Sequence, residues 1–301
     1  MLHRTRAALA TLTLLVAAPT LADEGMWLPE QLPDLADVLR ARGLELDPAR
    51  LGDLDAAPLN AVISLGGCSA SFVSPEGLVI TNHHCAVGAL QHNSTAERNL
   101  FDDGFYAETL ADEVSTGPGS RVYVTVGMTD VTDDVLDAIP AAANDMQRYE
   151  AIDTVRKELV AECEATPGYR CEVVSFYAGA SYRLIRRLEI QDVRLVYAPA
   201  GGIGFFGGDE DNWMWPRHTG DWTFLRAYVA PDGSGAPYAP ENVPYRPASH
   251  LEIRTTDLDP GDFVMVAGYP GGTYRFRTGS EMAWARDELY PRNVADRKSV
   301  V

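Results

Sequence analysis

Short apolar segments bounded by glycine and proline constrain the fold of this chain more than any other feature of its sequence. The segments Ala61–Leu65, Gly67–Val73 and Gly77–Thr81 are each long enough for one strand, and the turn Ser74-Pro-Glu-Gly77 separates the last two. Because strands and helices do not alternate along the chain, we expect a mostly β protein, a barrel or a sandwich, rather than a Rossmann sheet. The same pattern predicts further strands at Val122–Asp130, Cys171–Tyr177, Tyr182–Ile190, Val193–Ala198, Asp221–Ala230 and Asp262–Ala267.

Helical segments are fewer and interrupt the strands. Leucine spacing predicts a short amphipathic helix over Pro29–Leu44, and Ala283–Val294 also has helical character. Two glycine clusters, Gly201-Gly-Ile-Gly204 and Gly271-Gly272, match neither a P-loop nor a dinucleotide-binding fingerprint, so we expect tight turns there. The longest helical stretch is Ala141–Ala165, whose apolar residues are Met146, Tyr149, Ile152, Val155, Leu159 and Val160.

Composition narrows the class of protein and of partner. The 301 residues are 46% hydrophobic and 23% charged, which is typical of a globular protein and not of a disordered, collagen-like or disulfide-dense chain. The formal net charge is -18. Nucleic acids and anionic membranes attract basic surfaces, so this charge argues against both as partners.

The first 22 residues have the pattern of a cleavable signal peptide. Arg4 and Arg6 form a positive start, Ala8–Ala18 is mostly apolar, and Thr20-Leu-Ala22 offers small residues for cleavage before Asp23. The apolar run is well short of the roughly 20 residues that a membrane span needs, which argues against an anchor. We therefore expect an exported protein, periplasmic or secreted.

The four cysteines fit an oxidising compartment. Cys68, Cys85, Cys163 and Cys171 allow three connectivities, and we predict the simplest one, which joins Cys68 to Cys85 and Cys163 to Cys171. A loop of the size closed by the first bridge contributes roughly 3 kcal/mol in the chain-entropy model. The cysteine and histidine spacings that typify zinc sites do not occur in the sequence, so no metal site is predicted.

The sequence Thr81-Asn-His-His-Cys85 contains the first candidate for catalysis. It follows a predicted strand and lies downstream of Gly67-Cys-Ser-Ala70. In this respect it resembles the first barrel of chymotrypsin-like serine proteases, where a histidine directly precedes a cysteine bridged to the strand before it. Such a bridge would fix the loop that carries His84, and a general base needs its imidazole held within reach of the nucleophile. On this motif alone, two surface histidines beside a structural disulfide are an equally good interpretation.

A second motif, Gly207 to Asp221, makes the family resemblance specific. Its sequence Gly-Gly-Asp-Glu-Asp-Asn-Trp-Met-Trp-Pro-Arg-His-Thr-Gly-Asp brings two tryptophans, an arginine, a histidine and four acids into fifteen residues. Taken with Thr81–Cys85 and Gly268-Tyr-Pro-Gly-Gly-Thr-Tyr-Arg-Phe276, it closely resembles the S46 family of bacterial dipeptidyl peptidases. The resemblance begins at Asp23-Glu-Gly-Met-Trp27 and keeps the three motifs in the family's order.

The resemblance implies a fold and a division of the chain. The family has a chymotrypsin-like double β-barrel with a large helical domain inserted between the barrels. On that pattern residues 1–22 are the signal peptide, residues 23–276 are the N-terminal part of the peptidase domain with its first barrel, and residues 277–301 begin the inserted helical domain. The resemblance also implies oligopeptide substrates, no cofactor, and a homodimer for the full-length protein.

The resemblance further assigns site residues. The histidine of the family's Asn-His-His-Cys motif is the catalytic base and corresponds to His84, and the aspartate of its His-Thr-Gly-Asp motif orients that base and corresponds to Asp221. Asn212 and Trp213 correspond to residues that line the pocket for the substrate's free N-terminus. An asparagine carbonyl can accept a hydrogen bond from an α-ammonium group, and an indole ring can pack against it.

Other polar residues near these motifs are expected to be less important. By spacing alone, Asp209 and Asp211 are rivals of the orienting acid, and only the motif match favours Asp221. We expect the remaining histidines of the mature chain to be structural or on the surface: His83, His92, His218 and His250.

The nucleophile that the resemblance requires is not recognisable in these residues. The family's serine stands in a Gly-Asn-Ser-Gly-like loop of the second barrel, and the turns Gly117-Pro-Gly-Ser120 and Asp232-Gly-Ser-Gly235 lack that context. We therefore expect the chain to be the N-terminal part of an exported serine exopeptidase that releases dipeptides from free N-termini, and to be inactive alone. A non-catalytic exported module that binds peptide N-termini is the alternative.

Overall fold

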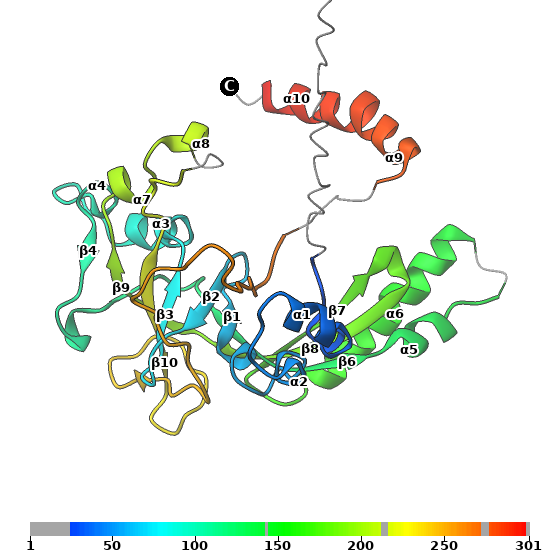
Figure 1. Ribbon diagram of the computed structural model, residues 1–301, viewed down its shortest axis with the longest axis horizontal. Coiled ribbons are helices and arrows are strands. Elements are labelled where there is room, and N and C mark those ends of the chain that lie inside the picture. The colour runs from blue at the N-terminus through cyan, green and yellow to red at the C-terminus, as the bar shows by residue number, and fades with distance from the viewer. Residues whose placement is uncertain (1–24, 142–143, 212–215, 272–276, 299–301) are drawn as a thin grey trace, which may run out of the picture.

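An antiparallel sheet contains every strand of the described residues, which are 25–141, 144–211, 216–271 and 277–298 (Figure 1). In this computed structural model the strand order is β4-β9-β10-β3-β2-β1-β6-β8-β7, with β11 paired to β10 and β5 paired to β9. All pairings are antiparallel, so the predicted mostly β class is confirmed. The strands are β1 (Val62–Ser64), β2 (Ser69–Phe72), β3 (Leu78–Thr81), β4 (Phe105–Tyr106), β5 (Val114–Ser115), β6 (Val122–Asp130), β7 (Tyr169–Phe176), β8 (Ser181–Ile190), β9 (Asp192–Ala198), β10 (Thr223–Val229) and β11 (Val243–Pro244).

Alternating burial explains why the short strands β2 and β3 form. Ala70, Phe72, Val79 and Thr81 are buried, while the residues between them are half-buried. Successive side chains of a strand point to opposite faces, so this alternation sets one face of each strand against the core. The turn between the strands contains Gly77 at a φ of 67°, a conformation that glycine adopts without strain.

Two apolar clusters stabilise the sheet. The larger one lies between the strands on the α3 side of the molecule, and the smaller one lies where the long strands β6, β7 and β8 extend away from it (Figure 1). Helix α6 covers the smaller cluster, whose buried members are Val131, Val135, Val173 and Tyr182. The larger cluster includes Ile63, Phe72, Val79, Leu90, Val122, Ile190, Leu195 and Leu225.

Helix α6 (Asp145–Cys163) is the predicted long helix. Asn144 caps it by accepting a hydrogen bond from the backbone N–H of Gln147. Of the six apolar residues noted in this stretch, Met146 and Tyr149 are exposed. The other four, Ile152, Val155, Leu159 and Val160, pack against the smaller cluster.

Other helices are short or interrupted. The predicted helix over Pro29–Leu44 is broken into 3-10 turns η1 (Pro29–Gln31) and η2 (Pro33–Leu35) before α1 (Ala36–Ala41), because Pro33 has no N–H to donate. Near the C-terminus, α9 (Gly279–Trp284), the π-helical turn η6 (Ala285–Leu289) and α10 (Tyr290–Lys298) contain the predicted helix. The remaining helical elements are α2 (Pro48–Leu51), η3 (Leu59–Ala61), α3 (His83–His92), α4 (Leu100–Asp103), η4 (Leu110–Asp112), α5 (Thr132–Asp137), η5 (Tyr177–Gly179), α7 (Gly201–Gly204) and α8 (Gly208–Asp211). Across the described ranges, none of these helices has both the length and the apolar character that a bilayer crossing demands.

One predicted strand is wrong. Residues Asp262–Ala267 are irregular, and Val266 is 99% exposed. A strand needs a neighbour to satisfy its backbone hydrogen bonds, and none of the strands in the described part of the chain pairs with this segment. Its alternating apolar residues therefore do not suffice to make a strand.

Both predicted disulfides are present. Cys68–Cys85 joins the chain just before β2 to α3, with 6.3 Å between the Cα atoms. Cys163–Cys171 joins the end of α6 to β7, with 6.1 Å between the Cα atoms. Each bridge therefore links a helix to the sheet at a separation usual for disulfides.

Asp192 and Arg194 of β9 form a buried charge pair. Asp192 is fully buried and accepts hydrogen bonds from Arg194 Nε at 3.1 Å, Arg194 Nη2 at 2.8 Å and Asn242 Nδ2 at 3.0 Å. The guanidinium carbon of Arg194 also lies 3.7 Å from the centroid of the Tyr228 ring. The two charges compensate each other inside the protein, so removing one leaves the other buried without an opposite charge.

Replacing the buried carboxylate tests this pair. We expect Asp192→Asn to lower the free energy of unfolding by about 3–5 kcal/mol, because Arg194 then keeps its charge in a buried site. Urea denaturation followed by circular dichroism measures the change. The matched control is Asp153→Asn, which removes an exposed pair with Lys157 on α6 and should leave the free energy of unfolding almost unchanged. Equal losses for the two variants would contradict the prediction.

Candidate active site

The pairing of β3 with β10 brings the two predicted catalytic side chains together. In this register Thr81, the last residue of β3, lies opposite Thr223, the first residue of β10. His84 lies in the first turn of α3, which follows β3, and Asp221 lies two residues before β10, so both leave the sheet at the same edge. Two residues that are 137 positions apart in the sequence therefore meet.

His84 and Asp221 form a hydrogen-bonded pair. His84 Nδ1 lies 2.9 Å from Asp221 Oδ2. An ionised carboxylate only accepts hydrogen bonds, so the proton is assigned to Nδ1, which leaves Nε2 as an acceptor. The side chain of His84 is 61% exposed, whereas that of Asp221 is 13% exposed. The imidazole thus offers a basic nitrogen to solvent while the acid holds its other nitrogen.

Two further donors hold Asp221. Its Oδ1 accepts a hydrogen bond from the backbone N–H of His84 at 3.0 Å, and its Oδ2 accepts one from Asn82 Nδ2 at 3.2 Å. The carboxylate therefore lies at the N-terminus of α3, where free N–H groups and the helix dipole favour a negative charge. Asn82 also donates to the backbone carbonyl of Asp221 at 3.1 Å. Sequence analysis missed this role of Asn82, because its partner is 139 residues away.

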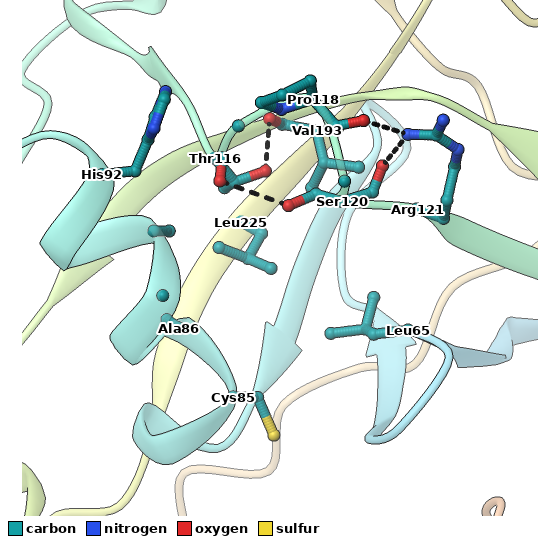
Figure 2. A pocket seen from close by; sticks show the side chains of 14 residues that line it. Leu65, Cys85, Ala86, His92, Thr116, Pro118, Ser120, Arg121, Val193 and Leu225 are labelled. Atoms are coloured by element: carbon teal, nitrogen blue, oxygen red, sulfur yellow. Dashed lines mark hydrogen bonds between the residues drawn. The ribbon is translucent and has the colours of Figure 1, made fainter.

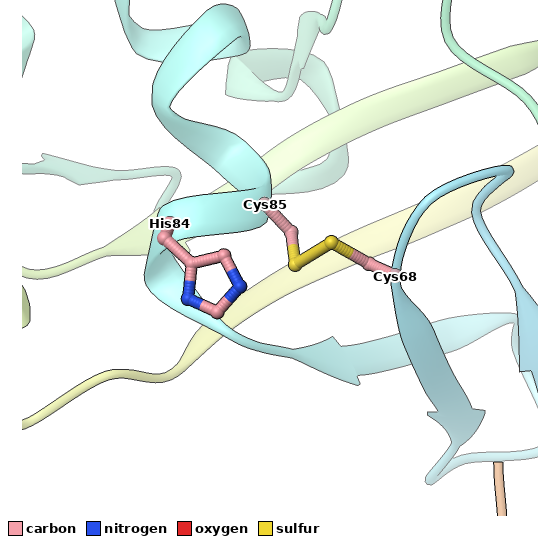
Figure 3. A group of neighbouring side chains, drawn as sticks. All are labelled: Cys68, His84 and Cys85. Atoms are coloured by element: carbon pink, nitrogen blue, oxygen red, sulfur yellow. A yellow bond between two sulfur atoms is a disulfide. The ribbon is translucent and has the colours of Figure 1, made fainter. Parts of the chain in front are cut away.

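The Cys68–Cys85 disulfide lies beside the candidate base (Figure 3). One potential ligand atom from each of Cys68, His84 and Cys85 lies within 4.8 Å of the others, a spacing compatible with a metal site. Zinc binds cysteine as a thiolate, and here the two sulfur atoms are bonded to each other. In this disulfide form, the group fixes the first turn of α3 next to β2.

The neighbouring His83 has the opposite environment. It is 1% exposed, its ring centroid lies 5.9 Å from that of Phe101, and its Nε2 has no hydrogen-bond partner in the described part of the protein. Burial is the largest influence on the pKa of His83 and lowers it. A hydrogen bond with the backbone of Pro199 and the charge of Asp221 raise the pKa, whereas the charge of His84 lowers it. The net effect is a lowered pKa, so the buried ring is neutral near pH 7.

The predicted binding residues Asn212 and Trp213 lie outside the described residues, as do the side chains of the rival acids Asp209 and Asp211. Hydrogen bonds connect the described residues that precede this segment with those that follow it. Thr219 Oγ1 donates to the carbonyl of Phe206 at 2.8 Å, and the N–H of Gly220 donates to the carbonyl of Ile203 at 2.9 Å. The segment therefore returns to α7 before it reaches Asp221. The other histidines of the prediction, His92, His218 and His250, are exposed.

A cavity of about 330 Å³ lies between α3 and residues 116–121 (Figure 2). Polar side chains of this segment bind its own backbone: Arg121 Nη1 donates to two carbonyl groups of the segment at 2.8 and 2.7 Å. Neither His84 nor Asp221 lines the cavity. It is therefore separate from the candidate active site.

Comparison with protein families identifies the class of this chain. The family model described as Peptidase S46 matches residues 22–300. The chain belongs to peptidase family S46. The resemblance seen in the sequence is thus confirmed, and the match includes both His84 and Asp221.

Curated relatives of this S46 chain are named as dipeptidyl peptidases. The Asp/Glu-specific dipeptidyl-peptidase of Shewanella putrefaciens is 48% identical over 286 residues, which cover 95% of this chain and 39% of the relative. The dipeptidyl-peptidase 7 of Phocaeicola vulgatus is 37% identical over 273 residues, which cover 88% of this chain and 38% of the relative. The chain thus spans less than half the length of these relatives.

Solved structures of similar proteins have the same architecture. The crystal structure of Porphyromonas endodontalis DPP11 in complex with substrate matches with a TM-score of 0.80 and 36% identity, over 88% of this chain and 40% of that chain. DPP11 in complex with the dipeptide Arg-Glu matches with a TM-score of 0.81 and 36% identity, over 88% of this chain and 39% of that chain. The antiparallel sheet with its short helices is therefore similar to the corresponding part of DPP11.

The lowered pKa of His83 makes stability depend on pH. In the unfolded chain the ring has an ordinary pKa of 6.5 and takes up a proton below it, whereas the buried ring resists protonation. The stability associated with the neutral ring is therefore fully present above about pH 6.5 and is lost as the pH falls toward the lowered pKa. We expect His83→Phe, which cannot protonate, to lose less unfolding free energy on acidification than wild type. The difference reaches at most about 1.4 kcal/mol per pH unit below pH 6.5.

Urea denaturation at about pH 7.5 and about pH 5.5 measures this difference. Gln91→Ala is the control, because Gln91 is exposed on the same helix and has no titratable group, so its replacement should leave the pH dependence unchanged. A His83→Phe variant that lost as much stability as wild type between the two pH values would show that His83 is not the titrating group.

Proposed function

We propose that this chain supplies the general base and the orienting acid of a serine peptidase that releases dipeptides from the free N-terminus of oligopeptides. One observation carries the proposal: the 2.9 Å contact between His84 Nδ1 and Asp221 Oδ2, with most of the imidazole exposed to solvent. Membership of family S46 and the names of the relatives support the same activity.

The chemistry follows from the two nitrogens of His84. The free Nε2 takes the proton of a serine hydroxyl as that oxygen attacks the peptide carbonyl, and the imidazolium then gives the proton to the leaving amine. Asp221 keeps the proton on Nδ1 and stabilises the imidazolium that forms between these steps. The serine belongs to a second barrel outside these residues, together with the donors that stabilise the oxyanion.

Recognition of the free N-terminus is assigned to Asn212 and Trp213. The amide carbonyl of Asn212 accepts a hydrogen bond from the substrate's α-ammonium group, and the Trp213 ring packs against it. Support comes from the motif match in the sequence and from the chain around these residues, which connects α7 to Asp221 through the Gly220–Ile203 hydrogen bond. A substrate amine bound there lies on the same chain segment as the orienting acid.

The proposal extends to the organisation of the chain. Residues 1–22 act as a signal peptide for export to the periplasm or the medium, and two disulfides support an oxidising compartment. Residues 23–276 form the N-terminal part of the peptidase domain with a chymotrypsin-like first barrel, and residues 277–301 begin an inserted helical domain. The full-length protein acts as a homodimer.

Variants of the pair test the catalytic roles in the full-length protein. We expect His84→Ala to lower kcat/KM by about 10⁴- to 10⁶-fold, because the serine loses its base. Asp221→Asn should lower it by about 10⁴-fold without unfolding the protein, because the histidine tautomer is then wrong. Hydrolysis of a fluorogenic dipeptide substrate measures both. The control is Asp137→Asn, an exposed carboxylate at the end of α5. Full turnover in folded Asp221→Asn would refute the role of that acid.

Recognition of the N-terminus has its own test. We expect Asn212→Ala to lower kcat/KM for a free peptide by roughly 10- to 100-fold, because a hydrogen bond to a charged group contributes about 1.5–3 kcal/mol. An N-acetylated version of the same peptide lacks that charge and should be a poor substrate of wild type. If wild type cleaved both peptides equally well, the protein would be an endopeptidase.

The alternative function, a non-catalytic module that binds peptide N-termini, makes a different prediction. If the proposed peptidase function is correct, the 301-residue chain alone should release no dipeptides, and the full-length protein should hydrolyse the free peptide. Calorimetric binding of that peptide, without hydrolysis by either protein, would favour the binding module. Dipeptide release by the 301-residue chain, abolished by a serine-directed inhibitor, would place a nucleophile within these residues.

A further inference from the structure

The helical turn α7 (Gly201–Gly204) packs directly on the buried His83. A methyl group added at Gly204 would overlap Cγ, Nδ1 and Cδ2 of the His83 ring, and one added at Gly201 would overlap the ring of Phe101. Since Phe101 also contacts His83, the two rings form one surface on which the turn rests. Glycine is required at these two positions by close approach, and the turn has no freedom to move toward α3.

The same turn also contacts the segment that leads to Asp221. The N–H of Gly220 donates to the carbonyl of Ile203 at 2.9 Å, and a methyl group added at Gly220 would lie 2.7 Å from Cγ2 of Ile203. Asp221 is the next residue in the chain. The position of its backbone is therefore set by α7.

These contacts close a circuit around the candidate pair. His83 supports α7, α7 supports Gly220, Gly220 carries Asp221, and Asp221 binds both the ring and the backbone N–H of His84. His84 then leads back to His83 as its neighbour in α3. A change in the spacing at any of these contacts would alter the distance between the carboxylate and the imidazole.

We propose that His83 is a positioning residue whose buried ring, through α7, sets the distance between Asp221 and His84. The inference rests on the proposed function for its catalytic meaning, although the circuit itself is a property of the fold. The ring acts as a flat spacer, so its shape matters more than its nitrogen atoms. The glycine cluster that carries no nucleotide-binding motif thus has a role, which is to let α7 lie on that ring.

The test adds a methyl group on one side of the turn and then on the other. Gly204→Ala forces α7 away from His83. Gly202→Ala is a matched control, because among the described residues a methyl group at Gly202 meets no atom outside its own turn within 4 Å. The readout is the tautomer of His84, measured on the isotope-labelled chain by long-range ¹H–¹⁵N correlation spectra. We expect wild type and Gly202→Ala to show the Nδ1–H tautomer alone, and Gly204→Ala to lose it in favour of a mixture of both tautomers.

Variants of the ring separate spacing from general destabilisation. His83→Ala removes the spacer and should also give mixed tautomers, while His83→Phe keeps a flat ring and should retain the Nδ1–H form of His84. The double variant Gly204→Ala with His83→Ala makes room for the added methyl group and should restore the single tautomer, so the two changes are not additive. A folded Gly204→Ala variant with the wild-type tautomer overturns the proposal. If a single variant fails to fold, the double variant decides: restoration supports the proposal, and no restoration overturns it.

The readout does not depend on peptide hydrolysis. If His84 showed the Nδ1–H tautomer but the full-length protein cleaved no peptide, the proposed function would be refuted and the spacer proposal would stand. If the tautomer of His84 were the same as in wild type in both Gly204→Ala and His83→Ala, and the full-length enzyme were active, the spacer proposal would be refuted and the proposed function would stand.

Discussion

The antiparallel pairing of β10 with β3 on one side and β9 on the other is the constraint on which the candidate site depends. β3 ends at Thr81 opposite Thr223, and β9 ends at Ala198, so the start of α3, the turn α7 and the approach to Asp221 all leave the sheet at one edge. Side chains alternate between the faces of a strand, so a slip of one residue in this register would turn Thr223 out of the core and displace Asp221. The buried faces of β3 and β10 oppose such a slip, because Val79 and Leu225 belong to the larger apolar cluster.

Two adjacent histidines have different properties because one side chain is buried and the other is exposed. The ring of His83 is enclosed by Phe101 and α7 and stays neutral, while most of the ring of His84 is in solvent and one nitrogen faces a carboxylate. Helical geometry explains the difference, because neighbouring residues of a helix point about 100° apart. The side chain of His83 therefore faces the core, and the side chain of His84 faces solvent. The disulfide at Cys85 then holds this first turn of α3 against β2.

Much of the sheet could be predicted from the sequence, because its strands have alternating or continuous apolar residues between turn residues. β6 has the predicted bounds, and β8 and β9 differ from the prediction by one residue at their starts. Helix α3 was not predicted, because it begins two residues after a strand and has no regular apolar stripe. Asp262–Ala267 has the sequence of a strand but no described partner, which local pattern cannot reveal. The motif match pointed to His84 and Asp221 as candidates, and these two side chains meet in the structure. Asn82 could not be predicted in this way, because its contact with Asp221 spans 139 residues.

The separation of the pair along the chain also has a consequence for how the protein folds. Contacts between distant residues form late, because closing a long loop costs entropy that only the completed sheet repays. His84 can be oriented only after β10 has paired with β3, and that requires the chain through Val229. A nascent chain that has not yet reached Val229 therefore carries the imidazole without its acid. Assembly order thus keeps the His84–Asp221 pair from forming before the sheet that holds it.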